Sequence, residues 1–204
     1  MNNKKYVITI TRQFGSLGRP IAKLMAKELG IEYYDRDIVD EAAKQLKLPA
    51  SVIDEEEESA KKTFKNPFSR MVFPLGGGTS NTQDDIFEAQ QNIIRFLAEK
   101  NSCIIVGRCS DFILSEMENV INIFIYAPYP DRVDNCVKSM GLEINEAKKM
   151  IVAVDEARDS YHMNYAGYLP GDRDHSDILI NSSLLGVEGT AQYLAELIKR
   201  KFEL

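Results

Sequence analysis

The chain has 204 residues, of which 44% are hydrophobic and 27% are charged, so it is long enough for one α/β domain with a sizeable core. Its net charge of −6 argues against an overall attraction to nucleic acid, and no apolar run approaches the length of a membrane span. Three cysteines without C-x-x-C spacing, and the lack of a signal sequence, predict a cytoplasmic protein with reduced thiols and no zinc site. The sequence does not determine the oligomeric state, and a homo-oligomer is one possibility.

The first predicted unit is a strand, a glycine turn and a helix. Residues 7–11, VITIT, are a β-branched run that is typical of a buried strand. Gly15 and Gly18 punctuate the turn, and the amphipathic helix that follows ends at Gly30. Backbone amides and the positive end of the helix dipole would converge here on an anion, so we expect a phosphate site at this turn.

Short apolar runs predict four more strands, and segments of helical periodicity separate them. The strands are expected at residues 31–34, 103–106, 122–126 and 177–180, and the helices start at Asp35 and Pro49 or span residues 84–100, 131–140, 145–161 and 187–202. This alternation indicates right-handed βαβ crossovers. The predicted fold is α/β, a three-layer α/β/α arrangement around a five-stranded parallel sheet.

Three turns of this fold should line one crevice, because ligands of such sheets bind beyond the carboxyl ends of the strands. These turns comprise residues 12–19, 35–37 and 107–109. Guanidinium groups bind phosphate bidentately, so Arg12 and Arg19, with the Ser16 hydroxyl, are candidate phosphate ligands.

The glycine turn departs from a full P-loop, which reads G-x-x-x-x-G-K-[ST]. The turn here reads R-Q-F-G-S-L-G-R-P, and neither glycine precedes a lysine. An ungapped comparison places Gly18 at the lysine position, whereas a shift of one residue places Arg19 there. Pro20 stands near the position of the magnesium-binding hydroxyl. A turn that only packs helix against strand is the alternative interpretation.

A dinucleotide-binding turn is a more remote alternative. The pattern G-x-x-G-R-x-I-A is also similar to that of short-chain dehydrogenases, and Asp35 stands about where a ribose-binding carboxylate is expected. That class requires a Tyr-x-x-x-Lys pair. Tyr161, Tyr165 and Tyr168 have no lysine four residues later, which argues against an NAD(P)-dependent enzyme.

Five segments, in order and spacing, resemble the cytidylate kinase-like group of P-loop nucleoside monophosphate kinases. They are ITITRQFGSLGRPIAKLMAKELG with YYDRD, CIIVGRCSDFIL, INIFIYAPYPDRV, VDEARDSYHMNY and SDILINSSLLGVEGTAQYL. The resemblance covers most of the chain outside residues 50–85. It implies the fold of P-loop nucleoside triphosphate hydrolases and a kinase that uses ATP and Mg²⁺. The implied partner is a small-molecule nucleotide, a CMP-like nucleoside monophosphate or a related acceptor, rather than nucleic acid or a membrane.

The resemblance also assigns roles to individual residues. The candidate nucleotide-binding residues are Arg12, Gly15, Ser16, Gly18 and Arg19, the candidate acceptor-binding residues are Arg36 and Arg108, and the candidate catalytic residues are Arg19, Asp35, Arg158 and Asp159. Phosphoryl transfer depends mostly on positioning and charge neutralisation, which arginines from several segments would supply. An Asp155–Arg158 helix pair is the structural alternative for Arg158.

The resemblance predicts one domain over residues 1–204, with an irregular insert at about residues 50–85 and a lid-like segment at about residues 158–175. His162 and His175 are expected in surface or hydrogen-bonded roles. Cytidylate kinases carry Asp-Gly-Arg-Asp where this chain has Val106-Gly107-Arg108-Cys109, so specificity for CMP is left open. The missing lysine leaves a non-catalytic, nucleotide- or anion-binding regulatory protein as the alternative function.

Overall fold

The computed structural model describes residues 5–35 and 80–204. The helices expected from Asp35 and Pro49, most of the irregular insert, and Arg36 lie outside the described residues. The predictions made for them stay predictions.

Five parallel strands form one sheet in the order β2-β3-β1-β4-β5. Their bounds are Val7–Arg12 for β1, Glu32–Tyr34 for β2, Cys103–Val106 for β3, Val120–Tyr126 for β4 and Ile178–Asn181 for β5. The apolar runs of β1 and β3 are fully or nearly fully buried, as expected for central parallel strands. The predicted five-stranded parallel sheet is confirmed.

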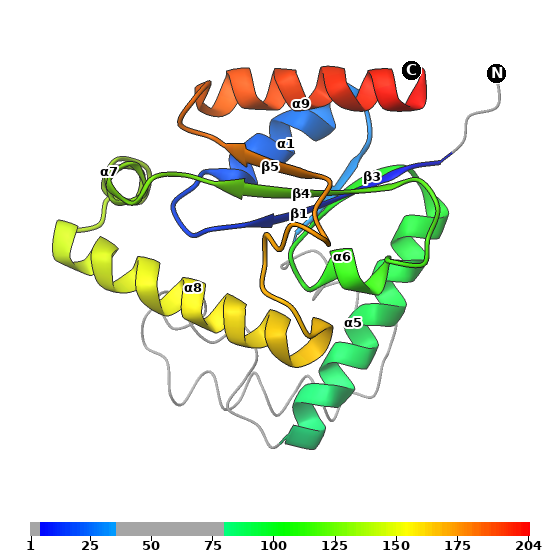
Figure 1. Cartoon of the computed structure of the whole chain (residues 1–204), viewed down its shortest axis with the longest axis horizontal. Helices are drawn as coiled ribbons and strands as arrows, with labels where there is room; N and C mark the ends of the chain where they lie inside the picture. The colour runs from blue at the N-terminus through cyan, green and yellow to red at the C-terminus, as the bar shows by residue number, and fades with distance from the viewer. Residues whose placement is uncertain (1–4, 36–79) are drawn as a thin grey trace.

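Helices cover both faces of the sheet. Their bounds are Gly18–Leu29 for α1, Ser80–Lys100 for α5, Ser110–Ile113 for α6, Tyr129–Met140 for α7, Ile144–Ala166 for α8 and Gly186–Phe202 for α9. Figure 1 shows α1 and α9 on one face, and α5, α6 and α8 on the other. The three-layer α/β/α architecture is therefore confirmed. Helix α8 is longer than the predicted 145–161, and α6 was not predicted.

Side chains that alternate along the strands build two cores. Ile8 and Ile10 of β1 pack with Ile21 and Met25 of α1 and with Leu194 of α9. On the opposite face, Val7, Cys103 and Ile105 pack with Ile93 and Ile94 of α5. Alternating side chains of a strand point to opposite faces, which explains why one strand contributes to both cores.

The strand order reverses beside β1. The chain leaves β1, builds β2 at the edge and returns to place β3 against β1, where Ile10 pairs with Val106. Ligands of open α/β sheets bind at the carboxyl ends of the strands at such a switch point. The fold therefore predicts a ligand-binding site at the turns after Arg12 and Val106.

Within residues 5–35 and 80–204, no helix combines the length and the apolar composition needed to cross a bilayer.

Candidate phosphate-binding site

The turn between β1 and α1 holds residues in left-handed backbone conformations. Gly15 has a φ of +78°, and Leu17, directly before α1, has a φ of +59°. A leucine in this region is uncommon and strained, and such strain tends to occur at functional sites. Among the described residues, no side chain caps α1, and the first amides of a helix have no intrahelical partner. Anions bind at helix N-termini of this kind, so the turn is a candidate anion site.

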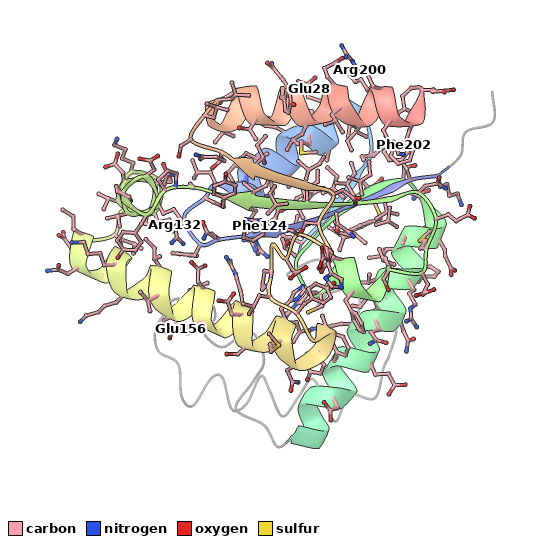
Figure 2. The ribbon with its side chains drawn as sticks, in the orientation of Figure 1. Glu28, Phe124, Arg132, Glu156, Arg200 and Phe202 are labelled. Carbon is pink, nitrogen blue, oxygen red and sulfur yellow. The ribbon has the colours of Figure 1, made fainter. Side chains whose placement is uncertain are left out.

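Side chains of α7 and α8 hold the backbone of this turn. The Phe14 N–H donates to Asp155 Oδ1 at 2.7 Å, and Asn135 Nδ2 donates to the Gly15 carbonyl at 2.9 Å. Arg132 Nη1 donates to the Phe14 carbonyl at 3.3 Å and also forms an ion pair with Asp155. Figure 2 labels Arg132 on α7, beside the turn at the end of β1. These contacts hold the turn against α7 and α8.

Ser16 is buried inside the turn. Its hydroxyl lies 2.9 Å from the Gln13 carbonyl oxygen and 3.1 Å from that of Ile125, to which it can donate. The Ser182 hydroxyl donates to the Ser16 carbonyl at 2.7 Å. This geometry favours a structural role for the Ser16 side chain over the predicted contact with phosphate.

Arg12 runs between two glycines from the end of β1 towards the end of β3. A Cβ atom at Gly107 would lie 2.5 Å from Arg12 Nη1, and a Cβ atom at Gly18 would lie 2.9 Å from Arg12 Cβ. Any larger residue would collide with Arg12. The approach of the Arg12 guanidinium and a φ of +80° both favour glycine at position 107, whereas at Gly18 the aliphatic stem of Arg12 leaves no room for a side chain.

Positive charge gathers around Arg12. Burial, followed by the charges of Arg158, Arg19 and Arg108, lowers the pKa of the Arg12 guanidinium well below its ordinary value. Burial is the main cause of the shift, and repulsion by the three neighbouring guanidinium groups adds to it. A bound anion would relieve that repulsion. The arginines come from β1, α1, the turn after β3, and α8, as the sequence predicted.

Arg158 reaches the turn from α8. Its Nη1 donates to the Arg12 carbonyl at 3.0 Å and lies 3.9 Å from Asp155 Oδ1, one helical turn earlier. Its guanidinium also lies 5.8 Å from the centroid of the Phe14 ring. The Asp155–Arg158 pair therefore exists, and it lies against the turn between β1 and α1 rather than on a solvated helix face.

Asp35 at the end of β2 reaches the start of α1. Its Oδ2 lies 3.3 Å from Arg19 Nε and accepts a hydrogen bond from the Tyr33 hydroxyl at 3.1 Å. Burial, and then the charge of Asp35, raises the pKa of Tyr33, so the phenol remains a donor. Asp35 and Arg19 are brought together as the prediction requires.

Asp159 is exposed on α8. Burial of part of the side chain, and then the charge of Asp155, raises the pKa of the Asp159 carboxyl, while His162 and Arg158 oppose the shift. No hydrogen bond joins the described residues of the turn to Asp159. Its catalytic role stays a prediction.

The turn after β3 is strained. Gly107, Arg108 and Cys109 have φ values of +80°, +59° and +51°, and the Arg108 side chain is buried. A non-glycine residue in this region costs about 1–3 kcal/mol of folding free energy, and it persists only where the surrounding structure enforces it. Burial, and then the charge of Asp111, raises the pKa of Cys109, so its thiol is not an activated nucleophile. This left-handed backbone places Arg108 directly after β3, at the switch point of the sheet.

The site offers few donors for a metal ion among the residues that the structure describes. Within the described residues, no group of three or more His, Cys, Asp or Glu side chains could hold one. Mg²⁺ is commonly bound by one or two carboxylates together with phosphate oxygens of a substrate. Asp35 supplies one carboxylate at the site, which fits a magnesium ion that arrives with a nucleotide.

Sequence comparison decides the family. A model of the cytidylate kinase-like family matches residues 7–184. The chain belongs to the cytidylate kinase-like family. This membership supports a kinase-like phosphotransferase and gives no support to a dinucleotide-dependent dehydrogenase. A search of curated protein sequences finds no match.

Solved structures agree with this assignment. An uncharacterized protein from Eubacterium ventriosum is 26% identical over 98% of this chain and 99% of its own length, with a TM-score of 0.70. TT1252 from Thermus thermophilus is 17% identical over 96% of this chain and 99% of its own, with a TM-score of 0.56. A shikimate kinase from Bacteroides thetaiotaomicron is 13% identical over 98% and 99%, with a TM-score of 0.51. The last two share the fold.

Sequence reasoning did not identify the side chains that hold the site together. Arg132 and Asn135 follow the proline-rich start of α7, and nothing in their local pattern marks them. Asp155 was noted only as a partner of Arg158. Its hydrogen bond to Phe14 spans 141 residues of sequence, so no short motif reveals it.

Proposed function

We propose that this protein is an ATP-dependent phosphotransferase of the cytidylate kinase-like family. It moves the γ-phosphoryl group of ATP to a nucleoside monophosphate or a related small phosphorylated acceptor in the cytoplasm. One observation carries the proposal: Arg19, Arg108 and Arg158, which come from separate elements, gather around partly buried Arg12, beside a helix N-terminus that no described side chain caps. Such a site neutralises several phosphate groups at once.

The proposed roles follow the positions of the residues. The backbone from Gly15 to Arg19, with Arg12, binds the nucleotide phosphates. Arg108 binds the phosphate of the acceptor from the end of the neighbouring strand. Arg158 joins both sides, because it contacts the phosphate turn and stands on the helix that covers the crevice. Magnesium, when it arrives with ATP, would neutralise phosphate oxygens near Asp35.

The identity of the acceptor is the finer part of this proposal. Cytidylate kinases carry an aspartate where this chain has Cys109, whose side chain is 1% exposed and packs in the core beneath α5. A thiol in that place cannot read a base from the crevice. The proposal therefore covers nucleoside monophosphates other than CMP, and related phosphorylated acceptors, as well as CMP itself.

A non-catalytic nucleotide-binding protein is the second candidate. It is favoured by the absence of a lysine after Gly18 and by the position of Arg19, whose Nε lies 3.3 Å from Asp35. An arginine held in this way is less available to a transferring phosphoryl group. Binding of ATP without acceptor-dependent turnover would support this candidate.

A panel of nucleoside monophosphates with Mg·ATP, read as ADP formation, tests the proposal. We expect turnover that depends on one acceptor and disappears in Arg108→Ala. Arg200→Ala is the matched control, because Arg200 is exposed on α9, across the sheet from the site (Figure 2). ADP formation that no acceptor stimulates, or that Arg108→Ala retains, would contradict the proposal. Urea unfolding of each variant confirms that it is folded.

A further inference from the structure

A buried polar cluster lies behind the acceptor side of the crevice. It consists of Asp111 on α6, His162 on α8 and Tyr168, which follows α8. The side chains of Asp111 and His162 are 7% and 4% exposed. Burial of charged groups costs free energy unless they are paired, so an arrangement of this kind needs a reason.

The hydrogen bonds of the cluster define the protonation state of His162. Its Nε2 lies 3.1 and 3.0 Å from the two carboxylate oxygens of Asp111, and its Nδ1 lies 2.9 Å from the Tyr168 carbonyl oxygen. The Tyr168 hydroxyl donates to Asp111 Oδ2 at 3.1 Å. The Tyr168 carbonyl can only accept, so Nδ1 carries a proton, and an imidazolium with two N–H donors would satisfy both Tyr168 and the Asp111 carboxylate.

The surrounding charges agree with this state. In the described parts of the chain, the charged and titratable groups that face His162 are Asp111 from α6, Asp159 on its own helix, and Tyr168. Burial alone lowers the pKa of His162, but the hydrogen bond and charge of Asp111, the Tyr168 carbonyl and the charge of Asp159 outweigh it and raise the pKa. Burial, and then the charge of Asp111, raises the pKa of Tyr168, which therefore remains a donor.

The cluster is connected to both sides of the crevice by short, rigid links. Asp111 lies three residues after Arg108, and backbone hydrogen bonds join Ser110 to Gly107 and Ile113 to Cys109 across the strained turn. On the other side, His162 lies one helical turn after Arg158, which donates to the Arg12 carbonyl. Residues four apart on a helix lie on the same face.

The segment after α8 packs against the cluster and against β4. The Tyr168 ring stacks on His175 with centroids 3.7 Å apart, and His175 Nδ1 lies 2.9 Å from Asp172. A Cβ atom at Gly171 would lie 2.6 Å from the Phe124 ring, so the segment also contacts β4 closely. Figure 2 shows Phe124 on the face of the sheet where this segment runs.

We propose that Asp111, His162 and Tyr168 are positioning residues, whose buried ion pair holds Arg108 and Arg158 at a fixed separation for the phosphate groups of the substrate. The proposal rests on the proposed phosphotransfer site. Loss of the proton on His162 leaves one ring nitrogen facing an acceptor, so the connection between α6 and α8 weakens. Anion binding at the crevice then weakens with rising pH.

The state of His162 is measured first, by NMR of its ring nitrogens in the full chain. We expect both nitrogens to be protonated at neutral pH in the native protein, and one to lose its proton in Asp111→Asn. A neutral His162 in the native protein at neutral pH would overturn the proposal. His175, the other histidine, provides an internal reference with a half-exposed ring.

Sulfate is the probe of the crevice, because its charge does not change between pH 6 and 9. We expect native affinity to fall as the pH rises through the measured midpoint of His162. Asp111→Asn should bind roughly 10-fold more weakly across the range, since a small misplacement of binding groups has effects of this size. Tyr168→Phe should also weaken binding. Tyr161→Phe is its matched control, since that hydroxyl donates to Gln90 on α5 instead.

The same variants separate this proposal from the proposed function. A native protein that shows the pH-dependent sulfate affinity but no turnover would retain the positioning role and lose phosphotransfer. If the native protein shows turnover, and both Asp111→Asn and Tyr168→Phe keep the native sulfate affinity and acceptor KM, then the phosphotransfer function is retained and the positioning role is refuted. A folded native protein that does not bind sulfate would overturn the positioning role.

Discussion

Replacement of Gly15 by alanine tests whether the phosphate turn is held against α7. Its φ of +78° disfavours any side chain, and the new Cβ would lie 2.7 Å from the Arg132 carbonyl oxygen. That carbonyl belongs to helix backbone and cannot rotate away. Either the turn or α7 must therefore shift.

The magnitude follows from a matched variant, Gly30→Ala. Gly30 has a φ of +63°, but a Cβ atom there would meet nothing within 4 Å. Both variants bear a left-handed strain of about 1–2 kcal/mol, reduced by about 0.4–1 kcal/mol through the stiffer unfolded chain. Gly15→Ala adds a steric overlap of about 1–3 kcal/mol. We expect Gly30→Ala to lose about 1 kcal/mol and Gly15→Ala about 2–4 kcal/mol.

Urea unfolding, followed by circular dichroism, measures this difference as a shift in midpoint at constant m. Sulfate affinity of the folded variants reports on the turn itself, and it should fall in Gly15→Ala and stay native in Gly30→Ala. Equal losses of stability in the two variants would refute the claim that α7 supports the turn.

Other consequences can be checked with the same assays. Asp155→Asn removes the charge that faces Arg132 and should cost about 2 kcal/mol of the free energy of unfolding, a value reduced for partial exposure. Glu156→Gln, its exposed neighbour that Figure 2 shows on the far side of α8, should cost less than about 0.5 kcal/mol. Equal costs would contradict the role of Asp155. His162 has a raised pKa in the folded state, so its contribution to stability is complete below about pH 6.5 and is lost as the pH rises through that raised pKa. The urea midpoint should therefore decline with rising pH more steeply in the native protein than in His162→Gln, and parallel profiles would contradict this.

The sheet could be predicted because its strands carry their signal locally. Residues 103–106 are a continuous apolar run and form a strand with the predicted bounds. Strand β4 starts two residues before the expected Asn122, because Val7 of β1 pairs with Val120 and extends the ladder. Only the neighbouring strand supplies that information.

Helix α8 shows a similar limit. Its apolar periodicity ends near Tyr161, yet the helix continues to Ala166. The additional turn is stabilised by packing against α5, where Tyr165 stacks on Phe87 with centroids 4.0 Å apart. Tertiary contacts of aromatic side chains therefore extend a helix that the sequence pattern alone would have ended.

The candidate site divides in the same way. Arg12, Arg19, Arg108 and Arg158 were predicted from a strand end, a glycine turn and a family resemblance, and their charges converge. Arg132, Asp111 and His162 were not assigned such roles, because the hydrogen bond that each forms reaches a residue distant in sequence. His162 was expected to be on the surface or hydrogen-bonded, and the second description is correct.

The central claim is that the arginine cluster transfers a phosphoryl group between small molecules. Phosphorus NMR of the native protein with Mg·ATP and each nucleoside monophosphate tests it most directly, because donor and product are observed together. We expect signals of ADP and of one nucleoside diphosphate to grow in equal amounts, and neither to grow with Arg108→Ala. ATP that stays intact with every acceptor, or that yields only inorganic phosphate, would contradict it.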